Sequence, residues 1–344
     1  MTVHFGDCRE VMRSMIERGE RVQMCVTSLP YFGLRDYGVE GQIGLEDSPA
    51  EFLDTMVAVF ALVWELLKDD GTVWLNMGDS YHNSSPSPGT QNGLLNNRKL
   101  STSRACRSAG KHQGWKEKDL MGMPWRTAIA LQEWGWYLRQ DIIWHKPNPM
   151  PESVRDRCTK AHEYVFLLSR SPRYYFDQDA IKEQASQDEY AAGFRGGSYT
   201  GGETYQNDKG GTRKQRGNVR AGGVPMGWQP GPGGHGSFHK AGRAEQKQYN
   251  PEYIPDGRKN KRSVWTIATE AFPGAHFATF PQALIEPCIL AGSRPGDTVL
   301  DPFFGSGTTG QVCNRLGRKH IGIELNREYE PLQIERTAQQ GLEL

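Results

Sequence analysis

Short apolar runs alternate along the chain with segments whose apolar residues recur at helical spacing. The clearest helix is expected at residues 50–67, where Ser48 supplies an N-cap, Pro49 a first-turn proline and Glu51 a capping-box acid. Strands that alternate with helices predict an α/β fold with a doubly wound, mostly parallel sheet, which binds ligands at the carboxyl ends of its strands. The pattern predicts strands at 22–27, 72–77, 142–144, 164–168, 299–300 and 320–323, and further helices at 125–134, 281–291, 309–316 and 327–339.

Two polar segments interrupt this alternation. Residues 80–118 show almost no apolar periodicity and are expected to form a long surface loop. From about residue 186 to 262 the composition changes again, and 15 of the 40 glycines fall between Gly193 and Gly236. Irregular segments of this length inside a domain are usually functional or disordered. Aromatic residues interleaved with Arg and Lys favour a functional segment here, because aromatic rings can stack on bases.

The overall composition argues against several classes of protein. Mean hydropathy is −0.66, and no run approaches the roughly 20 apolar residues of a membrane span. The six cysteines form no CxxC pair, which disfavours a disulfide framework and a zinc site. The first residues, MTVHFGDCREVM, lack the basic flank and apolar run of a signal peptide. We therefore expect a soluble cytoplasmic protein without membrane association and without metal ligands.

The net charge is only +1, but the charges are unevenly distributed. Residues 194–262 hold 13 Lys and Arg against 5 Asp and Glu, and residues 96–126 hold 8 against 2. Positive charge concentrated in this way is typical of a surface that binds a polyanion, because each neutralised phosphate releases counterions. Charge alone leaves solvated loops with incidental basic character as the alternative.

The most specific feature of the sequence is residues 296–325, GDTVLDPFFGSGTTGQVCNRLGRKHIGIEL, which predict a strand, a glycine turn, a helix and a second strand. The glycines at 305 and 307 allow a tight turn and the close approach of a ligand, and the helix N-terminus that follows presents its N–H groups to the site. Glu324 ends the second strand, where its carboxylate can accept both hydroxyls of a ribose. The pattern predicts a nucleoside-binding site.

Other glycine-rich loops fit less well. The spacing GxGxxG of dinucleotide-binding proteins is absent, and so is the GxxxxGK[ST] loop that holds a nucleoside triphosphate. Acidic residues on both sides of the loop would repel a pyrophosphate, whereas they suit a methionine moiety that carries ammonium and sulfonium charges. A tight turn in any α/β protein is the purely structural alternative.

The segment DPFFGSGTT followed by IGIE resembles the cofactor motif of the DNA amino-methyltransferases, which modify N4 of cytosine or N6 of adenine. The resemblance implies a Rossmann-like methyltransferase fold and S-adenosyl-L-methionine as cofactor. HFATFPQALIEPCI, residues 276–289, is similar to the segment that lies beside the methionine part of the cofactor. Asp7 matches the family's acidic residue at the adenine, with an exposed turn aspartate as the alternative. The cofactor-binding residues implied are Asp7, Phe280, Pro281, Asp301, Pro302, Phe303, Gly305, Ser306, Gly307, Thr308 and Glu324.

Residues 22–31, VQMCVTSLPY, predict a short apolar strand that ends in Ser28, Leu29, Pro30 and Tyr31, and these four residues resemble the family's (S/D/N)PPY catalytic motif. By this resemblance the Ser28 side chain and the Leu29 carbonyl accept the two N–H groups of the target amine, which stabilises the transition state. Tyr31 would stack on the target base after the base has rotated out of the duplex. Leu29 stands where proline is usual. Because it precedes Pro30, it is still biased toward an extended conformation, but reduced or altered activity is an alternative.

The order of these parts resembles the β arrangement of the family. Residues 1–185 are expected to form the catalytic part, 186–262 the target-recognition insertion, and 263–344 the cofactor-binding part of the same methyltransferase domain. Serine at position 28 favours N4 of cytosine as the target, with N6 of adenine as the alternative. The resemblance implies base flipping in double-stranded DNA and direct in-line transfer. The residues expected to bind DNA are Arg195, Arg213, Lys214, Arg216 and Arg220.

Rival functions explain the sequence less completely. A cytosine C5 methyltransferase needs a nucleophilic cysteine, and Cys288 after Pro287 is interpreted as core packing instead. RNA or protein amine methyltransferases would share the cofactor motif but not the large basic insertion. A DNA-binding relative without catalysis stays open because of Leu29, and the absence of a ligand cluster disfavours a metal-dependent nuclease. The resemblance is compatible with a cognate restriction endonuclease as partner and with a monomer or homodimer.

Overall fold

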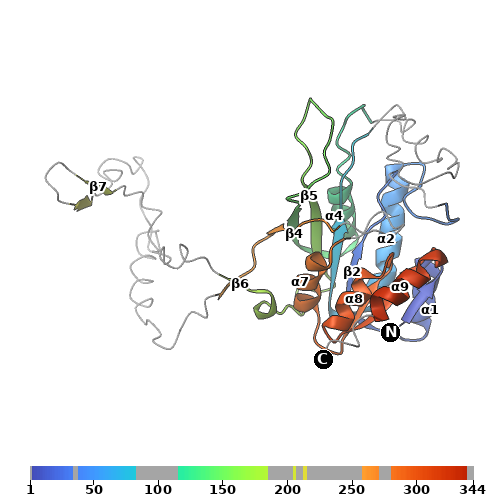
Figure 1. Ribbon diagram of the computed structural model, residues 1–344. Helices are drawn as coiled ribbons and strands as arrows, with labels where there is room; N and C mark the ends of the chain where they lie inside the picture. The colour runs from blue at the N-terminus through green and yellow to red at the C-terminus, as the bar shows by residue number, and fades with distance from the viewer. Residues whose placement is uncertain are drawn as a thin grey trace, which may run out of the picture. The chain divides into compact units, whose positions relative to one another are not determined.

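Eight strands form one sheet in the computed structural model, with helices on both faces (Figure 1). The structure describes residues 2–33, 38–82, 115–184, 258–270 and 280–338, and the backbone of 204–206 and 212–214. The strand order is β1-β12-β11-β2-β3-β5-β4-β10, and every pair is parallel except the two that β5 makes with β3 and β4. The strands are β1 (Thr2–Phe5), β2 (Val22–Ser28), β3 (Leu67–Met77), β4 (Tyr137–His145), β5 (His162–Ser169), β10 (Val264–Thr266), β11 (Thr298–Asp301) and β12 (Lys319–Glu324).

The expected doubly wound, mostly parallel sheet is confirmed. Helices α1, α2 and α4 pack on one face, and α7 and α8 pack on the other, with α9 against α8 (Figure 1). The helices are α1 (Cys8–Glu17), α2 (Pro49–Leu66), α4 (Met123–Trp134), α7 (Gln282–Gly292), α8 (Thr308–Arg315) and α9 (Glu330–Ala338), and the 3-10 turns are η2 (Asp179–Ile181) and η4 (Arg327–Tyr329).

Alternate side chains of the central strands enter two separate hydrophobic cores. In β2, Cys25 belongs to the core under α1, α2 and α4, while Met24 and Val26 belong to the core under α7 and α8. In β3, Leu75 and Trp74 divide in the same way. Strands buried on both faces have continuous apolar runs rather than polar alternation, which is why these strands were visible in the sequence.

The six strands and five helices expected from the sequence are all present, with ends displaced by a few residues. The N-cap of α2 is as expected, because the Ser48 hydroxyl accepts the N–H of Glu51 at 3.2 Å. The Glu51 carboxylate, however, accepts the N–H of Asp47 at 3.1 Å. Three elements of the sheet and its cover were missed, namely β1, α1 and β10, and β4 begins earlier than expected, at Tyr137. Met12 and Met15 are fully buried in α1, and their spacing is the signal that could have revealed it.

The chain divides into two compact units, residues 1–181 with 260–344, and residues 182–259. In the second unit β6 (Glu183–Gln184) pairs with β9 (Arg258–Lys259), and β7 (Thr204–Gln206) pairs with β8 (Thr212–Lys214), both antiparallel. Lys259 forms an ion pair with Glu183 across the first of these pairs. These two short strand pairs are the regular structure that the described part of this unit contains.

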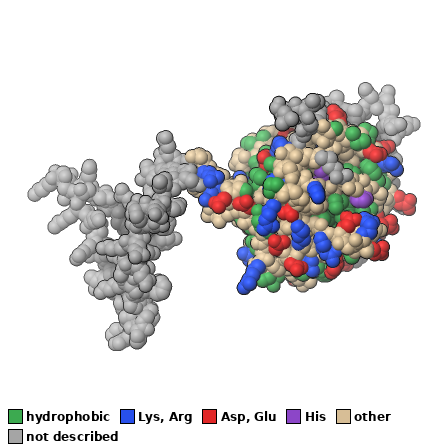
Figure 2. Space-filling model, turned by 90° about the horizontal axis from the view of Figure 1, so that it is seen from below, with side chains coloured by type: hydrophobic (Ala, Val, Ile, Leu, Met, Phe, Trp, Pro, Cys, Tyr) green, Lys and Arg blue, Asp and Glu red, His purple; other side chains and the backbone are tan. Residues whose placement is uncertain are grey.

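The amino ends and the carboxyl ends of the parallel strands form opposite sides of the first unit. The amino-end face, seen in Figure 2, mixes Lys and Arg side chains with Asp and Glu. Several charges of the first unit are paired, including Lys68 with Asp297 and Arg315 with Glu286. The carboxyl ends of β2, β11 and β12 carry the segments expected to bind ligand. Within the parts of the chain that the structure describes, no helix is long and apolar enough to span a membrane.

Candidate active site

Strands β2 and β11 are neighbours in the sheet although 274 residues separate their last buried polar residues. Val299 pairs with Met24 and Leu300 with Cys25 in parallel register. The strands therefore end side by side, at the edge where α/β sheets bind ligands. The Thr27 hydroxyl donates a hydrogen bond of 2.6 Å to the Asp301 carboxylate. This contact joins the catalytic segment expected after β2 to the glycine loop that follows β11.

The Asp301 carboxylate is fully buried and satisfied by three donors. Besides Thr27, it accepts the Thr309 hydroxyl at 2.5 Å and the N–H of Phe303 at 3.1 Å. Burial raises its pKa from the ordinary 3.8 to about 6, because desolvation outweighs the hydrogen bonds that favour the charged form. One side chain thus ties together β2, the start of the glycine loop and the first turn of α8.

The glycine loop turns sharply between β11 and α8. Gly307 is the N-cap of α8 with φ of 85°, a left-handed conformation that suits glycine, and no side chain caps the helix. Phe304 lies beneath the loop and stacks on His320 with ring centroids 5.7 Å apart. A Cβ at Gly322 would come within 2.4 Å of the Phe304 ring, so a side chain at this position of β12 is sterically excluded. The loop and the N-terminus of α8 are therefore fixed by packing.

Helix α9 fastens the outer side of the same loop. The Gln333 amide donates to the carbonyl of Gly305 at 2.7 Å. The Arg336 guanidinium donates to the hydroxyls of Ser306 and Thr308, both at 2.7 Å. Neither residue was identified from the sequence, because only the tertiary fold brings α9 against the loop.

The Glu324 carboxylate is held at the end of β12. One oxygen accepts the N–H of Gly305 at 2.7 Å and the other accepts the N–H of Asn326 at 2.8 Å. Burial raises the pKa of Glu324, against the opposing effect of these backbone donors. The second lone pair on each oxygen remains an acceptor, so the carboxylate can bind a vicinal diol.

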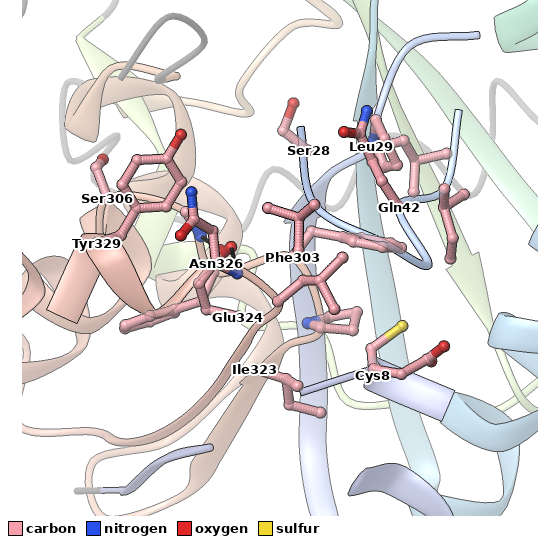
Figure 3. Close-up of a pocket in the computed structure, with 18 of the residues that line it drawn as sticks. Cys8, Ser28, Leu29, Gln42, Phe303, Ser306, Ile323, Glu324, Asn326 and Tyr329 are labelled. Carbon is pink, nitrogen blue, oxygen red and sulfur yellow. Dashed lines mark hydrogen bonds between the residues drawn. The ribbon is translucent and has the colours of Figure 1, made fainter. Parts of the chain in front are cut away.

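One pocket of about 1020 Å³, including the part open to solvent, receives both expected segments (Figure 3). Figure 3 shows Ser28 and Leu29 on one wall, Ser306 and Tyr329 across from them, and Glu324 and Phe303 between. The residues expected from the sequence that line the pocket are Asp7, Ser28, Leu29, Pro30, Phe280, Pro302, Phe303, Gly305, Ser306, Thr308 and Glu324.

The other expected site residues lie elsewhere. Asp301 and Gly307 lie behind the pocket wall, where they shape the loop, and Pro281 is the N-cap of α7. Tyr31 turns its hydroxyl toward Glu163. Of the residues expected to bind DNA, Arg195, Arg216 and Arg220 lie outside the described residues, and Arg213 and Lys214 are described only as backbone of β8.

Asp7 also caps a helix. Its carboxylate accepts the N–H of Arg9 at 2.8 Å as the N-cap of α1, and it accepts Nε of Arg9 at 2.9 Å. The Arg9 side chain holds the pKa of Asp7 below its usual value. The two interpretations of this residue are compatible, because a capping aspartate can also face the pocket.

The orientation of Ser28 is set by a buried amide. Its hydroxyl donates to the Asn76 side-chain oxygen at 3.2 Å, and the Asn76 side-chain nitrogen donates to the carbonyl of Tyr164 at 3.1 Å. Because that nitrogen faces a carbonyl, the amide oxygen must face Ser28 and accept its only hydrogen. Both lone pairs of the Ser28 oxygen are then available to accept hydrogen bonds. The N–H of Leu29 donates to the main-chain oxygen of Asn76 at 3.1 Å, which fixes the next residue of the segment.

A second polar group lies beside this amide. The Glu163 carboxylate accepts the Tyr31 hydroxyl at 2.9 Å, forms an ion pair with Lys146, and lies 3.4 Å from the Asn76 amide nitrogen. A Cβ at Gly78 would come within 3.0 Å of the Tyr31 hydroxyl. The aromatic ring at position 31 is therefore fixed from behind by hydrogen bonding and close packing.

The sequence held a usable signal for these missed residues. Asn76 lies near the end of β3, Lys146 follows β4, and Glu163 begins the antiparallel β5. All three therefore reach the carboxyl edge of the sheet, where polar side chains at strand ends point to a site. Their pairing, however, depends on the position of β5 between β3 and β4, which the sequence pattern does not specify.

Cys8 lines this pocket, but burial raises the pKa of its thiol, so the thiol stays protonated. Cys288 is buried in α7, and burial raises the pKa of its thiol well above the usual range, so the thiol stays protonated. Among the residues that the structure describes, no group of His, Cys, Asp and Glu could hold a metal ion.

The pocket's donor set fits a nucleoside that carries a cationic tail. Glu324 offers acceptors for a ribose, and Ile323 and Leu325 supply apolar surface beside it. The apolar ring of Phe280 and the hydroxyls of Ser306 and Thr308 line the pocket near the glycine loop. This combination matches the adenosine and methionine parts of S-adenosylmethionine.

Comparisons with known proteins agree with this geometry. A model of the N6/N4 methyltransferase family, described as DNA methylase, matches residues 22–335. Type II methyltransferase M.SmaI of Serratia marcescens is 42% identical over 331 residues, 96% of this chain and 88% of that protein. Type II methyltransferase M.Cfr9I of Citrobacter freundii is 39% identical over 335 residues, 97% and 87% of the two chains.

Solved structures share the fold at lower identity. PvuII DNA methyltransferase, described as cytosine-N4-specific, aligns with a TM-score of 0.57 and 17% identity over 99% of this chain and 87% of that one. A putative DNA modification methylase from Thermus thermophilus, solved with S-adenosyl-L-methionine, aligns with a TM-score of 0.54 and 21% identity over 100% and 95%. These alignments establish a common methyltransferase architecture.

We predict that Asp301→Asn changes the pH dependence of stability. Between pH 4 and pH 6 the folded protein retains a proton on Asp301 that the unfolded chain has already released, so this residue lowers the free energy of unfolding as pH rises through that window. Relative to the Asn variant, the wild type should therefore lose about 2.5 kcal/mol of stability between pH 4 and pH 7. Urea denaturation across this range measures the difference.

Asp297→Asn is the matched control. Although burial favours its neutral form, hydrogen bonds from the Arg294 N–H and Lys68 hold the pKa of Asp297 below its usual value. Its contribution to stability is present above the unfolded-state pKa and is lost as pH falls further, which is the opposite sign. A wild-type to Asp301→Asn difference that is equal at pH 4 and pH 7 would show that burial of Asp301 has no such effect.

Proposed function

The chain belongs to the N6/N4 DNA methylase family, and from this premise we propose that it transfers a methyl group to the N4 amine of cytosine in double-stranded DNA. The observation that carries the proposal is the shared pocket, in which the Ser28 segment and the Gly305 loop face the same space. A methyl donor held by the loop and an amine held by the segment would be close enough to react directly. N6 of adenine is the alternative target.

S-adenosyl-L-methionine is the cofactor, and when bound it supplies an electrophilic methyl group on a sulfonium that departs as a neutral thioether. Glu324 is positioned to accept the ribose hydroxyls, and Asp7 lines the same pocket for the adenine end. Phe280, Pro302 and Phe303 provide apolar walls, and Gly305 brings main-chain atoms close to the tail. With these assignments the methyl group would face Ser28.

The chain's own residues then activate the amine. The lone pair of an exocyclic amine is delocalised into the base, so two acceptors aimed at its N–H groups help it to become tetrahedral. The Ser28 oxygen can serve as one acceptor because its hydrogen is donated to Asn76. The carbonyl of Leu29 is the other proposed acceptor. Because both are fixed before the base enters, they need little reorganisation in the transition state.

The target base must leave the duplex to reach this edge. Rotating a base out of the stack lets a buried pocket contact its amine and its face. Tyr31 is the proposed stacking surface, and its hydrogen bond to Glu163 would hold the ring in a defined orientation. Pro30 lines the pocket between Tyr31 and the acceptors.

Leucine at position 29 is compatible with activity. Its side chain is 3% exposed and packs in the core under α2, and its N–H donates to Asn76. Burial and this hydrogen bond restrict the segment in place of the proline ring that the family usually has. The interpretation of this chain as a DNA-binding relative that has lost catalysis is therefore less favoured.

The relatives' designation as Type II methyltransferases supports a role in site-specific DNA modification alongside a restriction endonuclease. Residues 186–262 are proposed to read the target sequence, with Arg195, Arg213, Lys214, Arg216 and Arg220 on phosphates. Serine at position 28, together with the cytosine-N4 description of the PvuII enzyme, supports cytosine over adenine.

The decisive test identifies the product. Purified protein is incubated with mixed-sequence duplex DNA and S-adenosylmethionine, the DNA is digested to nucleosides, and the modified nucleoside is identified by mass spectrometry. We expect N4-methylcytosine. N6-methyladenine would replace the proposed target with the alternative, and the absence of any methylated base would refute the proposed function.

Substitutions in the two halves of the pocket should separate catalysis from cofactor binding. Ser28→Ala should lower kcat by about 100-fold, typical of losing one transition-state acceptor, while calorimetry shows unchanged affinity for the cofactor. Asn76→Leu should share this behaviour, because it frees the Ser28 hydroxyl to rotate. Glu324→Ala should instead weaken cofactor binding. Equal loss of cofactor affinity in Ser28→Ala and Glu324→Ala would contradict the assigned roles.

Replacement of Arg213, Lys214 and Arg216 by Ala should flatten the salt dependence of DNA affinity. Each lost phosphate contact reduces the slope of log K against log salt by about 0.9. Fluorescence anisotropy at several salt concentrations measures the slope, and replacing Arg18, Arg21 and Lys68 on the first unit by Ala is the matched control. An unchanged slope would place the DNA-binding surface on other residues.

A further inference from the structure

One face of the carboxyl-terminal segment lies along the glycine loop. Tyr329 lines the pocket, Gln333 donates to the Gly305 carbonyl, and Arg336 donates to two hydroxyls of the loop. The spacing of these residues, four and then three, places them on the same side of a helix. Gln333 is 2% exposed, and its side chain holds the loop by a hydrogen bond to the main-chain carbonyl of Gly305. Arg336 differs from Gln333, because it contacts side chains that face the pocket.

The contacts of Arg336 determine what the two hydroxyls can do. Its Nη1 lies 2.7 Å from the Ser306 oxygen and 2.7 Å from the Thr308 oxygen. A guanidinium only donates, so both oxygens act as acceptors toward it. Each hydroxyl can then turn its own hydrogen toward a third group. Ser306 and Thr308 both line the pocket, and their hydroxyls also lie within hydrogen-bonding distance of each other at 3.4 Å, with either one as donor.

Two sources of positive charge meet at this point of the pocket wall, the Arg336 guanidinium and the start of α8. Thr308 is the first residue of α8, and the N-cap Gly307 provides no side-chain acceptor for the free N–H groups of the first turn. The positive end of the helix dipole therefore adds to the guanidinium charge. Acidic groups also lie nearby: burial lowers the pKa of Arg336, the carboxylates of Glu270 and Glu335 oppose that shift, and Asp301 and Glu324 end adjacent strands. In the described part of the chain, none of these four carboxylates accepts a hydrogen bond from Ser306 or Thr308.

S-adenosylmethionine contains one anionic group, the α-carboxylate of its methionine part. With the ribose at Glu324 and the methyl group toward Ser28, the methionine tail would extend toward Ser306, which lies across the pocket from Ser28 (Figure 3). A carboxylate at this position would meet two hydroxyl donors backed by a guanidinium. Hydrogen bonds of this kind, with one charged partner, are stronger than neutral ones.

We propose that Arg336 is a positioning residue that orients the hydroxyls of Ser306 and Thr308 to bind the α-carboxylate of S-adenosylmethionine. The inference deepens the proposed function and rests on it. It assigns to α9 a role in cofactor selection, because a cofactor analogue without the carboxylate cannot use these donors. Arg336 acts through the two hydroxyls and does not line the pocket itself.

The test compares two ligands that differ only in this carboxylate. Calorimetric titrations without DNA measure the affinities of wild type, Arg336→Met and Thr308→Val for S-adenosylmethionine and for decarboxylated S-adenosylmethionine. We expect the wild type to prefer S-adenosylmethionine. Both variants should bind S-adenosylmethionine about tenfold to 100-fold more weakly, the usual cost of a hydrogen bond to a charged group, while binding decarboxylated S-adenosylmethionine as the wild type does.

Two further variants sharpen the result. Arg315→Met removes a positive charge from the far end of α8, where Arg315 pairs with Glu286, and it should leave both affinities unchanged. Arg336→Lys keeps the charge but has a single nitrogen, and it should recover part of the preference. Thr308→Val keeps the shape of the side chain, so it tests the proposal even if Arg336→Met perturbs folding.

The outcomes separate this inference from the proposed function. If wild type binds neither ligand and methylates no DNA, the proposed function fails. If wild type binds S-adenosylmethionine but Arg336→Met and Thr308→Val weaken both ligands equally, or weaken neither, Arg336 is only a scaffold and the inference is overturned. Loss confined to the ligand with the carboxylate supports it.

Discussion

A single buried hydrogen bond, from the Thr27 hydroxyl to the Asp301 carboxylate, joins the two halves of this site. The parallel pairing of β2 with β11 brings the two residues together, because Thr27 is the next-to-last residue of β2 and Asp301 is the last residue of β11. Asp301 then reaches Thr309 and the N–H of Phe303, so that the loop after β11 takes its conformation from the strand before Ser28. This hydrogen bond therefore helps to set the position of the Ser28 segment relative to the glycine loop. A carboxylate is costly to bury, and three donors offset that cost.

The site is built in two layers of different chemistry. The groups that face the pocket are few, and several are backbone atoms or small hydroxyls. Behind them stand larger side chains from remote segments: Asn76 behind Ser28, Glu163 behind Tyr31, and Arg336 behind Ser306 and Thr308. Each of these larger side chains forms a hydrogen bond that orients the hydroxyl in front of it. An acceptor whose own hydrogen is already donated is preorganised for an incoming amine, which is how electrostatic catalysis avoids reorganisation.

Leu29 illustrates how a departure from a motif can be absorbed. A proline would restrict the segment through its ring, whereas here a buried apolar side chain and a backbone hydrogen bond to Asn76 restrict it. Leu29, directly after β2, therefore belongs both to the hydrophobic core and to the lining of the pocket. In the described part of the second unit, residues 182–259, the regular structure consists of short strand pairs such as β7 with β8.

The sequence by itself determined the elements whose signals are local. Continuous apolar runs revealed β2, β3, β5, β11 and β12, and capping residues revealed α2. The glycines at 305 and 307 revealed the tight turn between β11 and α8. Only the tertiary structure decided the partners that come from elsewhere in the chain. Asn76 and Glu163 lie at strand ends and Arg336 lies in α9, but the partners of all three follow from strand order and from the docking of α9, which no local pattern specifies. Hydrogen bonds between remote segments depend on which strands become neighbours, and a periodic pattern of apolar residues specifies burial without specifying neighbours.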